Sequence, residues 1–135
     1  IGVGVSQTLP VVVGAVEPNC TIFAVEQPEL HIHPAVQSRM GDLFLRECLG
    51  TPGRIFLLET HSEHLMLRML RRIRETADGE LPPGYPRVTP EDVQVLYVES
   101  EGGVTSIVPL PITEDGDFAQ KWPHGFFTER EEDLF

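Results

Sequence analysis

Short apolar runs alternate with amphipathic segments in the first half of the chain. Residues 21–25 and 54–58 are largely apolar without polar alternation, a pattern typical of buried parallel strands; prolines flank the first run, and Pro52-Gly53 precedes the second. Apolar residues then recur at helical spacing over residues 34–48 and 65–73. The resulting strand–helix–strand–helix order predicts the α/β class, with a mostly parallel sheet and flanking helices.

The N-terminal segment predicts a loop that leads into a helix. Gly2 and Gly4 permit a tight backbone path before the apolar stretch of residues 8–16. We expect Ser6 to cap this helix, and Pro10 to lie near its start, where a proline is tolerated.

The C-terminal part predicts a hairpin followed by a separate tail. Residues 93–98 and 104–108 have the composition of strands, and the Gly-Gly pair between them is typical of a hairpin turn. The remainder, residues 113–135, is acidic and aromatic, with a short helix expected over residues 128–134. We interpret it as a module distinct from residues 1–112.

Composition indicates one soluble domain in the cytoplasm. The chain has 135 residues, of which 41% are apolar and 23% charged, and no apolar run is long enough to span a membrane. No leader-like segment opens it, and two cysteines are too few for a disulfide framework, which favours a reducing compartment. The net charge of −11 argues against a surface that binds nucleic acid as a whole.

Polar side chains follow both predicted parallel strands. Glu26 comes directly after the first strand, and Thr60 and His61 follow the second. Because ligands of parallel α/β sheets bind beyond the carboxyl ends of the strands, an acid and an imidazole are expected along one rim. A carboxylate at that position can hold Mg²⁺. The alternative interpretation is that these residues only mark where the strands meet water.

Three segments together resemble an ABC-type ATPase head. Residues 2–7 (GVGVSQ) are similar to its signature loop, residues 22–34 (IFAVEQPELHIHP) to its Walker B strand and D-loop, and residues 57–62 (LLETHS) to its switch-histidine loop. The resemblance is to the C-terminal half of the head, in the bacterial OLD-like, RecF-like and SMC-like group. Residues 122–135 resemble a short C-terminal module of unassigned function found on some of these proteins.

The resemblance implies a P-loop NTPase-like half-domain with ATP and Mg²⁺ as ligands. Gly4, Ser6 and Gln7 would form the signature loop, which in the family contacts the γ-phosphate of a nucleotide bound to the opposite subunit. A second copy of the head is therefore an implied partner, and each composite site would pair one subunit's Walker B strand with the other's signature loop.

The same resemblance assigns roles to the strand-end residues. Glu26 stands at the position of the Mg²⁺-associated acid, and Gln27 at that of the catalytic base. His33 occupies the position of the usual D-loop aspartate, and His61 that of the switch histidine. Glu29 is a further candidate that could assist hydrolysis.

Two departures from the family pattern bear on activity. Glutamine at position 27 can orient water but cannot act as a general base, which predicts slow or gated turnover. The sequence also has no Gly-x-x-x-x-Gly-Lys-Ser/Thr loop, and it opens within the signature motif. We therefore expect the Walker A half to be missing, and these residues alone not to bind ATP usefully.

By resemblance, the expected function is ATP binding and hydrolysis coupled to pairing of two heads. The expected cellular role is DNA maintenance or anti-phage defence. DNA or an effector protein is a possible partner, and no contact with a membrane is expected. One alternative is a nucleotide-gated interaction module with little hydrolysis. A weaker one is a metal-dependent hydrolase that uses the side chains of His31, His33, Glu59, His61 and His64.

An arginine-rich stretch follows the second strand. Arg68, Arg71, Arg72 and Arg74 are spread over more than one helical face, and nearby glutamates offset part of their charge. We interpret them as a solvated helix surface rather than as a site for phosphate or DNA.

Overall fold

The structure, a computed structural model, describes residues 3–122. The elements follow one another as helix α1 (Val3–Val16), strand β1 (Ile22–Glu26), helix α2 (Pro34–Leu49), strand β2 (Ile55–Glu59), helix α3 (Glu63–Ala77), the 3₁₀ helix η1 (Pro90–Asp92) and strands β3 (Val95–Glu101) and β4 (Val104–Leu110). Strands β1 and β2 pair in parallel and β3 and β4 antiparallel, so both predicted pairings are confirmed. The helix expected over residues 128–134 lies outside the described residues.

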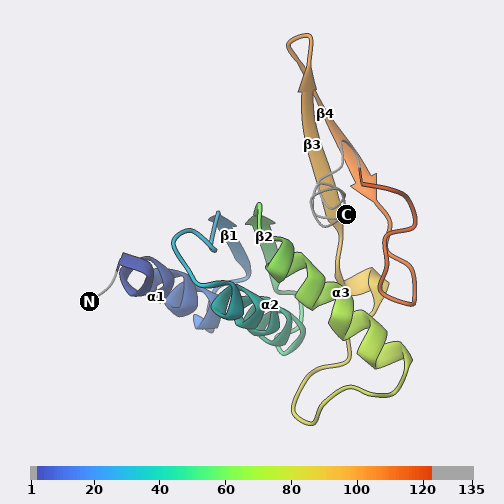
Figure 1. The fold of residues 1–135 in the computed structure, drawn as a ribbon. Coiled ribbons are helices and arrows are strands. Elements are labelled where there is room, and N and C mark those ends of the chain that lie inside the picture. Colours follow the sequence, from blue (N-terminus) through green and yellow to red (C-terminus); the bar gives the residue numbers. More distant parts are fainter. Residues whose placement is uncertain (1–2, 123–135) are drawn as a thin grey trace.

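All three α-helices contribute to a core on one face of the β1–β2 sheet (Figure 1). Phe44 of α2 and Leu65 of α3 are almost fully buried there. The ring of Phe56 meets those of Phe23 and Phe44 edge to face, at centroid distances of 5.4 and 5.7 Å. Burial of one such aromatic side chain contributes about 2–3 kcal/mol, so this layer anchors both strands to the helices.

The opposite face of the β1–β2 sheet is exposed. Ile22, Ile55 and Leu57 are 65%, 57% and 63% accessible, because strand side chains alternate between faces and no described element covers this one. The expectation of strands buried on both sides is therefore wrong for residues 3–122. Parallel sheets are almost always covered on both faces, so this apolar surface is unusual for the fold class.

Helix α1 begins earlier than the sequence pattern predicts. Gly4, Ser6 and Gln7 lie in its first two turns rather than in a loop, and Ser6 is not its N-cap. Pro10 is inside the helix, where it removes the donor that would bond to the Ser6 carbonyl. The helix persists because the apolar stretch after Thr8 packs against the core, which outweighs the lost hydrogen bond.

The hairpin of β3 and β4 projects away from the helices (Figure 1). Its turn is formed by Gly102 and Gly103, whose φ angles of 59° and 80° are both in the left-handed region. A two-residue turn with this geometry matches the twist of antiparallel strands and strongly favours glycine. Trp122, the last described residue, packs edge to face on Tyr97 of β3. No described helix is both long and apolar enough to cross a membrane.

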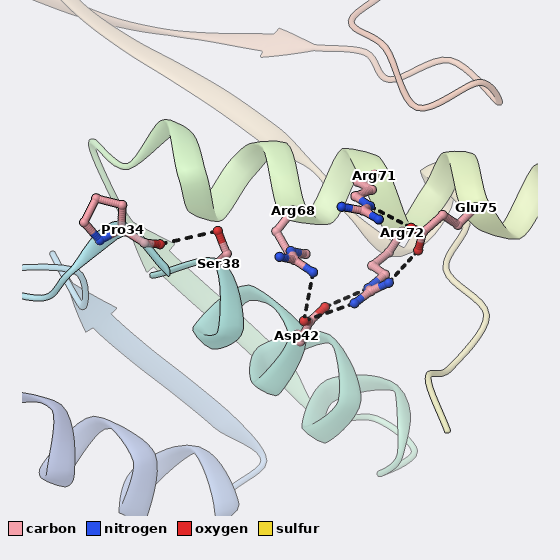
Figure 2. A network of polar contacts seen from close by, with 7 residues as sticks. All are labelled: Pro34, Ser38, Asp42, Arg68, Arg71, Arg72 and Glu75. Carbon is pink, nitrogen blue, oxygen red and sulfur yellow. Dashed lines mark hydrogen bonds and ion pairs between the residues drawn. The ribbon is translucent and has the colours of Figure 1, made fainter. Parts of the chain in front are cut away.

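One arginine of α3 is less solvated than expected (Figure 2). Arg72 is buried, and its guanidinium bonds to both carboxylate oxygens of Asp42 and to Glu75. It also stacks over the ring of Tyr85 at 3.8 Å from the centroid. The solvated interpretation is wrong for this residue because α2 packs along α3 and places a carboxylate opposite it.

Candidate functional site

The carboxyl ends of β1 and β2 lie side by side, as the sequence predicts. In the parallel register Glu26 pairs with Glu59, and the Gln27 backbone amide donates to the Glu59 backbone carbonyl at 2.7 Å. Both glutamate side chains are exposed and belong to the same sheet face as Leu57. Like charges opposite each other on a sheet are unfavourable without a positive group near them.

Glu29 joins the two loops that follow the strands. Its side chain is buried, with 9% of the residue accessible, and its Oε1 accepts a hydrogen bond from the His61 backbone amide at 2.7 Å. Its Oε2 is buried and has no hydrogen-bond partner among the described residues. His61 is an exposed residue, and it lies at the edge of the sheet formed by the carboxyl ends of β1 and β2, which we call the rim.

The turn around Glu29 has an unusual backbone. Gln27 and His31 have φ angles of 46° and 60°, in the left-handed region that costs a non-glycine residue about 1–2 kcal/mol. Such conformations persist only where surrounding contacts fix them, and they gather at functional sites. Here the turn is fixed by the Leu30 amide bonding to the Gln27 carbonyl and by the Glu29 carboxylate bonding to the next loop.

The loop after β2 is held at a second point. The Ser62 hydroxyl donates to Gln37 Oε1 at 2.7 Å and accepts from the Leu65 amide, so Ser62 is the N-cap of α3. Gln37 Nε2 in turn donates to the Ile32 carbonyl at 2.9 Å. This side chain therefore links the turn after β1 to the first turn of α3.

A groove of about 400 Å³ lies between α1 and the turn that leads into α2. Its lining residues are Gly4, Val5, Thr8, Leu9, Val12, His31, Ile32, His33 and Val36. Helix α1 approaches the turn so closely that a Cβ on Gly4 would lie 2.6 Å from the His31 carbonyl oxygen. His33 caps α2, its Nδ1 accepting from the Ala35 amide at 3.2 Å.

The predicted site residues thus fall into three groups. Glu26, Gln27, Glu29 and His61 come together at the strand ends. Gly4 and His33 line the groove, whereas Ser6 and Gln7 are exposed on α1 and do not line it.

Sequence reasoning missed one member of this region and considered another only as a ligand of a metal-dependent hydrolase. The latter, Glu59, occupies the same place at the end of β2 that Glu26 has at the end of β1, a positional match visible in the sequence. Gln37 has no such signal, since a glutamine in a first helical turn is ordinary and only the packing of α2 against α3 gives it partners.

The histidines within residues 3–122 do not gather into a metal centre. Within residues 3–122, no three His, Cys, Asp or Glu side chains gather closely enough to hold a metal ion. The set proposed for a metal-dependent hydrolase, which includes His31, His33, His61 and His64, is therefore not assembled, because these residues are divided between the turn and the start of α3.

Comparison with known families finds one match. A protein family of unknown function, DUF3696, matches residues 88–135. The matched part holds η1 and the hairpin, and it includes none of the candidate site residues. No curated protein and no solved structure matches the chain.

Proposed function

We propose that this chain supplies the Walker B half of an ABC-type, P-loop NTPase-like head, which binds and hydrolyses ATP when two heads pair. The observation that carries the proposal is the parallel register of β1 and β2, which sets Glu26 and the His61 loop along one rim. That arrangement is what phosphoryl transfer needs, namely a group that holds the metal beside a group that can reach the γ-phosphate.

The rim has the right chemistry for Mg²⁺. This ion is usually held by one or two carboxylates, with water and substrate phosphates completing its shell. Glu26 and Glu59 offer two adjacent carboxylates, and no third His, Cys, Asp or Glu among residues 3–122 joins them, which fits that pattern. Bound there, Mg²⁺ would neutralise charge on the β- and γ-phosphates.

The protein groups have separate roles in this proposal. Glu26 holds the metal, Gln27 orients the attacking water through its amide, and His61 bonds to the γ-phosphate. The groove that contains Gly4 and His33 faces the second copy of the head. Because an amide cannot take the proton from water, turnover is expected to be slow.

The remaining part of the head is a required partner. The sequence contains no phosphate-binding loop, so that loop must come from another polypeptide segment. The exposed face of Ile22, Ile55 and Leu57 supports this, because a parallel sheet of this kind is stable when further strands or helices cover it. We call this chain together with that segment the complete head.

Phosphate release from Mg-ATP by the complete head tests the proposal. Glu26→Gln and His61→Ala are each expected to lower turnover by about tenfold or more, since the first weakens the hold on the metal that neutralises phosphate charge and the second removes the group that contacts the γ-phosphate. Glu80→Gln, an exposed glutamate after α3, serves as the matched control and should leave turnover unchanged. Unchanged turnover in both rim variants would refute the assignment.

The second candidate, a nucleotide-gated interaction module, is favoured by Gln27 alone. It predicts that Mg-ATP drives pairing of heads while phosphate release stays at background. Gln27→Glu separates the two functions, because restoring a carboxylate at the base position should raise turnover if the rim is catalytic. A role in DNA maintenance or anti-phage defence is proposed by resemblance alone.

A further inference from the structure

We propose that Glu29 and Gln37 are positioning residues that set the place of His61, rather than groups that react with the substrate. The inference about loop geometry stands on the contacts themselves, and its consequence for turnover rests on the proposed function. It replaces the earlier hypothesis that Glu29 assists hydrolysis directly.

The carboxylate of Glu29 is bonded to the loop that follows β2. Its Oε1 bonds to the His61 amide at 2.7 Å, and a hydrogen bond to a charged acceptor is shorter and stronger than a neutral one. The other oxygen, Oε2, is buried and not accessible to bulk water. A general base must lie within hydrogen-bond reach of the attacking water, and a carboxylate enclosed in this way is poorly placed for that task.

The left-handed backbone on both sides of Glu29 agrees with this role. Gln27 and His31 adopt an unfavourable conformation, and the turn they form is what aims the Glu29 side chain at the neighbouring loop. In this interpretation the backbone strain is offset by the bond that the carboxylate makes.

Gln37 fixes the same loop one residue further on. It donates to the Ile32 carbonyl and accepts from the Ser62 hydroxyl, so its amide orientation is set at both ends. Ser62 is thereby held as the N-cap of α3, and His61 is fastened on its N-terminal side by Glu29 and on its C-terminal side by Gln37.

Amide hydrogen exchange tests the geometry without any nucleotide. In the protein as it exists, Glu29→Ala should accelerate exchange of the His61 amide by about tenfold to a hundredfold, the range set by loss of a bond to a charged acceptor. Glu29→Gln keeps a carbonyl acceptor and should stay close to the original protein, as should the control Glu80→Ala. Should Glu29→Ala not fold, Glu29→Asp takes its place, because it keeps the charge but is too short to reach His61.

Gln37→Leu gives an independent measurement of the second contact. It removes both the donor to the Ile32 carbonyl and the acceptor of the Ser62 hydroxyl, so exchange at the Leu65 amide, which bonds to Ser62, should also accelerate. Unchanged exchange at His61 in Glu29→Ala or Glu29→Asp would overturn the proposal, whatever the activity of the complete head.

Turnover in the complete head tests the consequence. Glu29→Ala should lower kcat with little change in KM, and Glu29→Gln should restore most of the lost kcat. If Glu29→Gln is as inactive as Glu29→Ala, the carboxylate itself takes part in chemistry and the positioning role is wrong. If the original protein releases no phosphate, the proposed function fails, while hydrogen exchange still decides the role of Glu29.

Discussion

Arg72 of α3 is bonded to Asp42 of α2 through both carboxylate oxygens, and its replacement by alanine gives a quantitative prediction. The guanidinium lies 2.8 and 3.2 Å from the two oxygens of Asp42 and bonds to Glu75 (Figure 2). Only 4% of its side chain is accessible, compared with 13% for Asp42 and 14% for Glu75. The change therefore leaves two largely buried carboxylates short of a partner.

The magnitude follows from what remains after the change. Removal of one member of a buried ion pair costs about 3–5 kcal/mol, because the other charge stays buried without compensation. Asp42 would keep Arg68 at 3.4 Å and Glu75 would keep Arg71 at 2.6 Å, which places the loss at the lower end of that range. We expect the free energy of unfolding to fall by about 3 kcal/mol.

Urea unfolding followed by circular dichroism measures this loss. For a slope of about 2 kcal/mol/M, the midpoint should fall by about 1.5 M. Arg71→Ala is the matched control, because its side chain is 61% exposed and a surface ion pair contributes less than about 1 kcal/mol. Equal losses for Arg71→Ala and Arg72→Ala would show that burial does not determine the strength of this network.

Three further predictions concern pH, helix packing and a buried cation. Burial works to raise the pKa of Glu75, but hydrogen bonds from two arginines of α3 outweigh it and hold this pKa below the ordinary 4.5. Stability from this carboxylate is therefore present above about pH 4.5 and is lost as the pH falls through the lower folded value, so Glu75→Gln should flatten the acid limb of a stability–pH curve. Gly4→Ala should lower the melting temperature, because its methyl group would meet the His31 carbonyl at 2.6 Å; an unchanged value would show that α1 can shift. Arg54→Met should cost about 2–4 kcal/mol in urea unfolding, because the buried guanidinium bonds to three backbone carbonyls at and after the end of α1; a loss below about 1 kcal/mol would contradict this.

The elements that sequence patterning located best are those with strong local signals. Pro34 opens α2 as predicted, because a proline suits the first helical position, and the Gly-Gly pair forms the hairpin turn because both residues need positive φ. The start of α1 was misplaced since glycine and serine favour caps and loops locally, while packing of the following apolar turns extends the helix across them.

The placement of the strand-end residues could be predicted where topology alone decides position. Parallel pairing brings Glu26 and His61 to one rim because strand ends of neighbouring parallel strands share an edge. The roles of Glu29, Gln37 and Arg72 could not be predicted, because each depends on partners about 25 to 32 residues away in the sequence. Burial of a charged or polar group becomes visible only once those partners are placed.

Paramagnetic broadening tests our proposal that the ends of β1 and β2 form one metal–nucleotide site. Mn²⁺ replaces Mg²⁺ with a non-hydrolysable ATP analogue bound to the complete head, and backbone amide signals report distance from the ion. We expect broadening to be strongest at Gln27, Glu59 and His61 and to be lost in Glu26→Gln, while signals of the hairpin stay sharp. Broadening centred away from both strand ends, or unchanged in Glu26→Gln, would contradict it.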